Sequence, residues 1–180
     1  MKPLRPQIAQ LQSSKIRDVA NAGMGRDDVL AFWFGESDQV TPDVVRQAAI
    51  HSLQQGETFY AHNLGLPALR EAIAHYTRTL HPHQSGLTHE RISVTSGGVN
   101  ALMLAMQAIL GAGDECLVVT PIWPNLIAQP QILGADVRTF SLQPVNGLWQ
   151  LDVQALLRRI TPRTRLLVVN SPNNPSGWTL

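Results

Sequence analysis

The chain has 180 residues, of which 44% are hydrophobic and 15% charged, and its formal net charge is +1 at pH 7. This length allows one sizeable core, or one domain and part of another. The charge balance lacks the basic excess that nucleic-acid binding usually needs. No stretch approaches the roughly 18 apolar residues of a membrane span. We therefore expect neither a nucleic-acid partner nor insertion into a membrane.

The N-terminus and the cysteine content indicate the compartment. Residues 1–20 carry early positive charge but no continuous apolar run, so they do not resemble a signal peptide. Cys116 is the single cysteine, and its place in ECLVVT predicts a buried strand position in a reducing environment. The expected location is the cytoplasm.

The first 90 residues are predicted to be mainly helical. A helix with uncertain ends is expected over residues 1–22, followed by a short strand, VLAFWF, over 29–34. Thr41 as N-cap and Pro42 at the first helical position predict the start of a second long helix. A third helix is expected over residues 65–80, where apolar side chains recur at helical spacing.

From Arg91 onward, strand and helix patterns alternate. Strands are predicted over 91–96, 115–120, 136–140 and 165–170, and helices over 99–110, 124–134 and 152–160. This alternation predicts an α/β fold with a largely parallel sheet covered by helices. Ligands of open sheets bind beyond the carboxyl ends of the strands, so the loops at Ser96, Thr120 and Ser171 are expected on one rim.

One of these loops, in VTSGGVNAL, leads from a strand through Gly97 and Gly98 directly into a helix. Glycines allow a ligand to approach the backbone, and the N–H groups at a helix start favour an anion such as phosphate. The alternative is a tight turn that needs glycine for its geometry alone. The sequence matches neither the dinucleotide-binding nor the P-loop pattern.

Three further side chains have both a ligand-binding and a structural interpretation. Trp123, in a proline-flanked loop, can stack on a flat heteroaromatic ligand or serve as a core residue. The amides of Asn173 and Asn174 can bind a ligand or form an ordinary turn. The Tyr60 hydroxyl can bind a phosphate oxygen or anchor its loop.

The remaining polar clusters predict no site. The histidines at 81, 83 and 89 lie among Pro, Gly and Gln, as in an exposed connection, so we expect no metal ion there. The basic stretch RRITPRTR spans a helix end and a turn, where arginines interact favourably with the helix dipole and with water.

The motifs gain meaning from their order. FGESD followed by TP, then YAHNLGLPALREAI, TSGGVNAL, TPIWPN and VVNSPNNPSG follow one another along the chain. This series resembles the N-terminal half of a class I/II aminotransferase of the aspartate aminotransferase superfamily, which is a fold type I pyridoxal-phosphate family. One departure is Ser37, which stands where the family usually has Pro.

The resemblance implies an α/β/α sandwich with a mostly parallel sheet, the family's large domain, here incomplete. It assigns residues 1–45 to an N-terminal arm and the first strand of the small domain, and 46–180 to the first half of the large domain. The implied partners are an amino acid and a 2-oxo acid, and the implied assembly is a homodimer with shared sites.

The resemblance also implies roles at matching positions. The N–H groups of Gly97, Gly98 and Val99 would hold the phosphate of pyridoxal 5′-phosphate. Trp123 would stack on its ring, and Asn174 would bind its phenolic oxygen near the substrate carboxylate. Gly35 would offer its backbone to that carboxylate, and Tyr60 would reach the phosphate in the neighbouring subunit.

The family's chemistry needs a lysine for the Schiff base and an acid at the pyridine nitrogen. The only lysines are Lys2 and Lys15, neither in the family's Ser-x-x-Lys context. We therefore predict no catalytic residue in this chain and no activity of the chain alone. The alternatives are a PLP-dependent β-lyase, a complementing half, and a non-enzymatic or decayed product that keeps a phosphate pocket. An exposed edge of the incomplete sheet predicts poor solubility.

Overall fold

The computed structural model describes residues 3–180, which form two compact units. The helical unit is Ile16–Gly97. The sheet unit is Gly98–Leu180 together with the N-terminal segment up to Lys15. Each unit is described by itself below.

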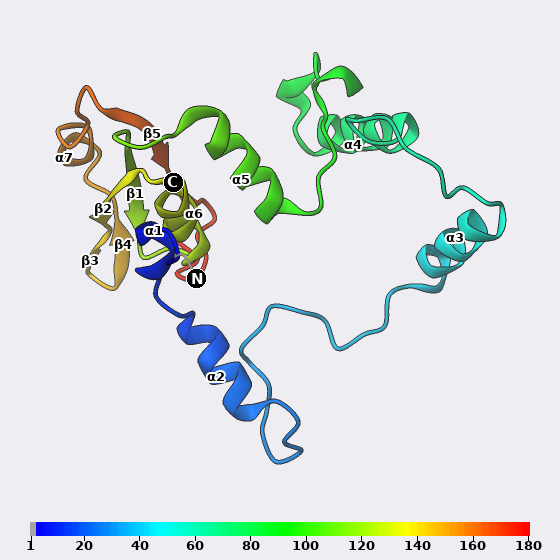
Figure 1. Ribbon diagram of the computed structural model, residues 1–180, viewed down its shortest axis with the longest axis horizontal. Helices are drawn as coiled ribbons and strands as arrows, with labels where there is room; N and C mark the ends of the chain where they lie inside the picture. The colour runs from blue at the N-terminus through cyan, green and yellow to red at the C-terminus, as the bar shows by residue number, and fades with distance from the viewer. Residues whose placement is uncertain (1–2) are drawn as a thin grey trace. The chain divides into compact units, whose positions relative to one another are not determined.

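The centre of the sheet unit is a three-stranded parallel sheet in the order β2-β1-β5 (Figure 1). Its strands are β1 (Glu115–Thr120), β2 (Asp136–Ser141) and β5 (Thr164–Val168). The connecting helices are α6 (Asn125–Leu133), between β1 and β2, and α7 (Val153–Leu157), before β5. Helix α5 (Gly98–Ile109) precedes β1.

Side chains of β1 alternate between the two faces of the sheet, as a strand requires. Cys116 and Val118 belong to a core cluster with residues of α5 and α6, whereas Leu117 and Val119 pack with Leu156 of α7. The sheet is thus covered by helices on both faces. The predicted α/β fold with a parallel sheet is confirmed.

Local sequence explains where several of these elements begin and end. Asp152 is the N-cap of α7, and its Oδ1 accepts a hydrogen bond from the N–H of Ala155 at 2.8 Å. Gly134 ends α6 in the left-handed conformation, at φ 89°. Both features agree with the predicted helix boundaries.

Two smaller elements complete the sheet unit. Helix α1 (Pro6–Ala9) contacts α6, and β3 (Gln143–Val145) pairs antiparallel with β4 (Leu148–Gln150). The hairpin turn is Asn146-Gly147, with both residues at positive φ. Asn-Gly favours this two-residue turn because both positions need the left-handed region.

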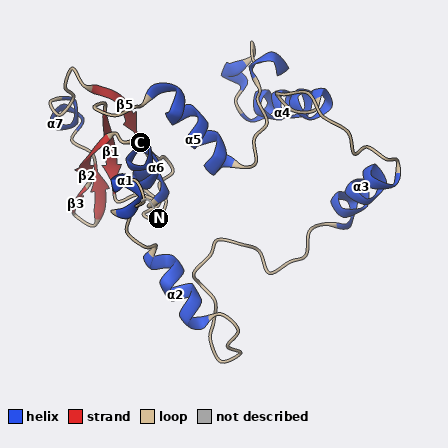
Figure 2. Cartoon of the chain, viewed as in Figure 1, coloured by secondary structure: helices blue, strands red, loops and turns tan. Residues whose placement is uncertain are grey.

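The helical unit consists of helices and loops, without a strand in its described residues, as Figure 2 shows. Its helices are α2 (Lys15–Gly23), α3 (Asp43–Gln54) and α4 (Pro67–Leu80), with two short 3-10 turns, η1 (Pro82–Gln84) and η2 (His89–Arg91). The long helices predicted from Thr41 onward and over residues 65–80 are confirmed. Thr41 is not the N-cap, however, because Pro42 takes that position and the helix begins at Asp43.

Three predictions for this half of the chain need correction. The single helix expected over residues 1–22 is two helices, α1 and α2, and its first two residues lie outside the described part. Residues 29–34 form no strand, and Leu30 and Phe32 are exposed. Residues 91–96 also form no strand. Neither segment pairs with another strand in the part described, and a strand is stabilised by its ladder.

The segment over 92–97 is held instead by single contacts. Arg70 of α4 is buried, and its guanidinium donates to the carbonyls of Ile92 at 2.9 Å and His89 at 2.8 Å. The Val94 N–H donates to the Leu64 carbonyl at 2.9 Å. These contacts fix the chain that leads into the Gly97-Gly98 turn.

Candidate functional site

The first feature of the candidate site is the open start of α5. Gly97 has φ +97°, and a Cβ built on either Gly97 or Gly98 would meet no atom within 4 Å. The N–H groups of the first helical turn have no carbonyl partner within the helix, and the helix dipole adds partial positive charge there. The backbone at Gly98 and Val99 is therefore suited to an anion.

The second feature is the loop after β1, which contains Trp123. This side chain is half-buried and packs against the core cluster that includes Cys116 and Val118. Helix α6 begins two residues later, and its Gln129 side chain donates to the Val99 carbonyl at 2.8 Å. This hydrogen bond places the first turn of α5 beside the helix that follows Trp123.

The third feature is the loop after β5. Asn173 is buried, and its Nδ2 donates to the Pro121 carbonyl at 3.0 Å, while its Oδ1 accepts from the N–H and hydroxyl of Ser176 at 3.1 and 2.9 Å. Asn174 is exposed, and its backbone N–H donates to Asn170 Oδ1 at 2.9 Å. Asn173 thus holds the loops together, whereas the Asn174 side chain is accessible to a ligand.

Two hydrogen bonds hold this part of the sheet unit together, and the loops at Thr120 and Ser171 meet at the carboxyl ends of β1 and β5, as predicted. One hydrogen bond joins α5 to α6, and another joins the β5 loop to the β1 loop. Gly98, Val99, Trp123 and Asn174 all belong to this one unit. Together they offer backbone N–H donors, an indole ring and an exposed amide.

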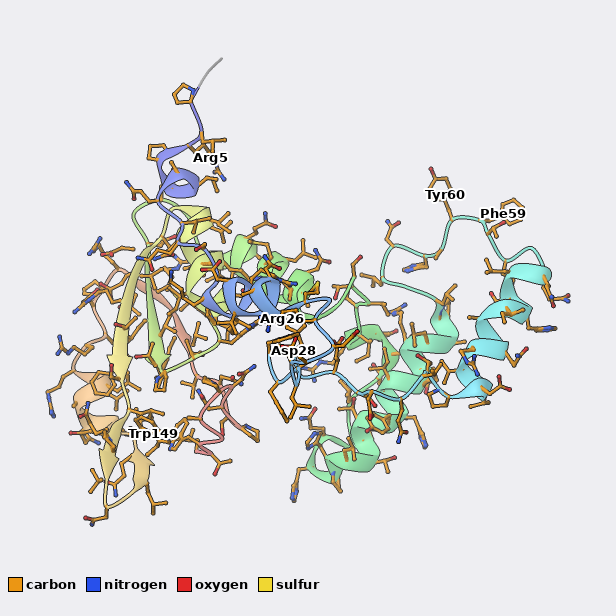
Figure 3. The ribbon with its side chains drawn as sticks, turned by 90° about the horizontal axis from the view of Figure 1, so that it is seen from below. Arg5, Arg26, Asp28, Phe59, Tyr60 and Trp149 are labelled. Carbon is orange, nitrogen blue, oxygen red and sulfur yellow. The ribbon has the colours of Figure 1, made fainter. Side chains whose placement is uncertain are left out.

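The other three predicted site residues, Gly35, Tyr60 and Gly97, lie in the helical unit, with Gly97 as its last residue. Tyr60 is fully exposed, and Figure 3 shows it beside Phe59, pointing away from the loop between α3 and α4. Gly35 is also exposed, and a Cβ there would meet nothing within 4 Å. Their roles in ligand binding stay predictions.

A buried carboxylate lies at the opposite end of β1. Glu115 accepts hydrogen bonds from the hydroxyls of Thr164 and Thr161, the latter at 3.3 Å, and from the Arg138 guanidinium at 3.0 Å. The Thr164 hydrogen bond above all, then Arg138, lowers the pKa of Glu115 against the opposing effect of burial. The carboxylate is thus ionised and fully engaged, and it joins β1 to both neighbouring strands.

The single cysteine is not a reactive thiol. Burial raises the pKa of Cys116 to about 11, so its thiol is protonated and inert near neutral pH. Lys15 is the first residue of α2, and Lys2 lies outside the described residues. In the part of the chain that the structure describes, no helix is long and apolar enough to cross a membrane.

Comparison with known proteins shows which family the chain is similar to. The family model for "Aminotransferase class I and II" matches residues 28–180. The aspartate/prephenate aminotransferase of Thermus thermophilus is 38% identical over 179 residues, covering 98% of this chain and 44% of that protein. The aspartate aminotransferase of Pyrococcus horikoshii is 31% identical over 96% of this chain and 44% of that protein.

Solved structures agree with the sequence comparison. A mutant Thermus thermophilus aspartate aminotransferase complexed with tryptophan matches with a TM-score of 0.87 and 36% identity, over 99% of this chain and 47% of that chain. The N-succinyldiaminopimelate aminotransferase of Mycobacterium tuberculosis matches with a TM-score of 0.73 and 32% identity, over 81% of this chain and 38% of that chain. The chain spans about half the length of the relatives it matches.

Proposed function

Because the chain belongs to the class I and II aminotransferases, we propose that it provides the cofactor-holding part of a pyridoxal 5′-phosphate-dependent aminotransferase. The reaction would transfer an amino group between an amino acid and a 2-oxo acid. The observation that carries the proposal is that one hydrogen bond joins the first turn of α5 to α6, the helix after Trp123, and another joins the Asn174 loop to the loop that contains Trp123.

The described residues fit this cofactor by the chemistry of their donors. The N–H groups of Gly98 and Val99, with Gly97 ahead of them, would bind the phosphate, and the absence of side chains on the glycines leaves room for it. Trp123 would cover the ring and exclude water from one side. The Asn174 amide would donate to the phenolic oxygen. Bound there, the cofactor would supply an electron sink for bond breaking at the amino acid Cα.

The substrate side of the site would draw on residues outside the sheet unit. The exposed backbone of Gly35 would bind the substrate carboxylate, together with Asn174. Tyr60 would donate to the phosphate bound by a second subunit, and its full exposure supports a contact outside its own unit. We propose a homodimer on this basis. We also propose the family's domain division at about residue 45, which rests on the family membership alone.

The chain alone would bind the cofactor but would not catalyse transamination. Its only lysines, Lys2 and Lys15, lie in no Ser-x-x-Lys sequence of the kind the family uses. The residues here bind and orient, and the proton transfer at the substrate Cα would need a base from elsewhere. We expect no transamination by the purified 180-residue chain above the rate of free pyridoxal 5′-phosphate.

Calorimetric titration with pyridoxine 5′-phosphate and with pyridoxine tests the proposal, because these analogues lack the aldehyde that reacts with surface amines. We expect the phosphorylated form to bind at least tenfold more tightly. Replacing Trp123 with Phe should weaken both ligands, whereas Trp149→Phe, on the hairpin strand β4, should weaken neither. Equal affinity for the two forms, or no binding of either, would refute the proposed function.

A further inference from the structure

One polar side chain in the sheet unit is buried although its carbonyl oxygen has no hydrogen-bond partner. Gln129 of α6 is 4% exposed, and its Nε2 donates to the Val99 carbonyl at 2.8 Å. Its Oε1 has no hydrogen-bond partner, and among the described residues it is the one buried side-chain nitrogen or oxygen atom in this state. Buried polar atoms are normally paired, so this exception needs a reason.

The hydrogen bond from Gln129 to the Val99 carbonyl is not one of the backbone hydrogen bonds that form α5. Val99 lies in the first turn of α5, so its carbonyl already accepts a hydrogen bond from within the helix. The contact therefore does not complete the helix but attaches its first turn to α6. Because Oε1 has no partner, the bond to Val99 alone directs this amide.

The position of Gln129 connects the two halves of the proposed ligand site. It lies on the helix that begins two residues after Trp123, and it contacts the turn whose N–H groups face the proposed phosphate. The next residue, Pro130, is fully buried inside the helix and has no N–H to offer. The side chain of Gln129 is thus the polar link from α6 to the first turn of α5.

We propose that Gln129 is a positioning residue that sets the distance between the phosphate-binding turn of α5 and the ring-binding Trp123. This inference rests on the proposed function. A ligand that carries both a ring and a phosphate needs both contacts at once, and a fixed spacing avoids the entropy cost of arranging them on binding. This role explains why the buried Gln129 amide is present although its Oε1 has no hydrogen-bond partner.

Replacing Gln129 with Met, which has similar length but no donor, tests the proposal. We expect the affinity for pyridoxine 5′-phosphate to fall about tenfold, because the turn of α5 must then be ordered relative to Trp123 when the ligand binds. The affinity for pyridoxine, which contacts the ring site alone, should stay within about twofold. Gln131→Met, at an exposed position of the same helix, should change neither. Unchanged affinity for the phosphorylated ligand, or equal loss for both ligands, would overturn the proposal.

Nuclear magnetic resonance of the unmodified chain provides a second readout that does not depend on a variant folding. Titration with pyridoxine 5′-phosphate should shift the side-chain amide signals of Gln129 together with the backbone amides of Gly98 and Val99. Pyridoxine should leave those signals in place. Backbone shifts at α5 with unmoved Gln129 signals would overturn this inference alone. Failure of the chain to prefer the phosphorylated ligand would instead refute the proposed function.

Discussion

Gly98 permits a substitution that separates phosphate binding from stability. A Cβ added to Gly98 would meet no protein atom within 4 Å, and φ at Gly98 is not in the left-handed region. Alanine is also the better helix former, so Gly98→Ala should change the free energy of unfolding by between zero and a gain of about 1 kcal/mol. Because Cβ atoms tilt toward the helix N-terminus, the new methyl group would project to where the phosphate binds.

The cost of that methyl group to binding follows from the donor it displaces. A hydrogen bond from a backbone N–H to a charged group contributes about 1.5–3 kcal/mol. Losing one should therefore weaken pyridoxine 5′-phosphate binding by about tenfold to a hundredfold. The predicted result is a variant as stable as the original chain that binds the phosphorylated ligand poorly.

Gly113 provides the matched control, because it lies in the same unit, in the turn between α5 and β1. Its Cβ would also meet nothing within 4 Å, but its φ is +92°. Gly113→Ala should lower the free energy of unfolding by about 1–2 kcal/mol and leave ligand affinity unchanged. Urea unfolding followed by circular dichroism, with calorimetric titration, measures both quantities. Undiminished affinity in Gly98→Ala, or a stability loss equal to that of Gly113→Ala, would refute the reasoning.

Three further predictions concern the fold. Gly65→Ala should lower the free energy of unfolding by about 2–5 kcal/mol, because φ is +102° and its Cβ would lie 2.6 Å from the Val94 side chain. Gly56→Ala is the control, because Gly56 has positive φ but no such contact, and it should lower the free energy of unfolding by only about 1–2 kcal/mol. Urea unfolding measures both changes. The lowered pKa of Glu115 means that its carboxylate stabilises the fold fully above its ordinary pKa, and that this contribution is lost as pH falls through the lower folded value. Glu115→Gln should flatten the acid side of the stability profile, and an unchanged profile would contradict the assignment. Cys116, with its pKa near 11, should resist thiol reagents at mildly alkaline pH until urea exposes it, so rapid labelling of the folded chain would show that the burial is wrong.

The sequence predicted the sheet unit better than the helical unit. Strands β1, β2 and β5 are β-branched or apolar runs bounded by turns, and the helices between them leave little choice of pairing. Residues 29–34 and 91–96 have the same local pattern, but no partner strand pairs with them in the structure. Whether a strand forms depends on its neighbours, which a local pattern does not reveal.

The same limit applies to the candidate site. Motif order predicts binding roles for Gly98, Trp123 and Asn174. Asn173 and Asn174 have identical chemistry, and only burial shows that the first is structural and the second accessible. Gln129 escaped prediction because a glutamine in a helix usually indicates a solvent-facing position. Its contact with Val99, 30 residues away in the chain, follows from the packing of α6 on α5.

A crystal structure of the 180-residue chain with pyridoxine 5′-phosphate tests the central claim most directly. We expect the phosphate within hydrogen-bonding distance of the Gly98 and Val99 N–H groups, with the ring against Trp123. A phosphate bound elsewhere, for example in the cavity of about 330 Å³ that Gln7 and Gln10 of the N-terminal segment line with Gln131, would contradict the account.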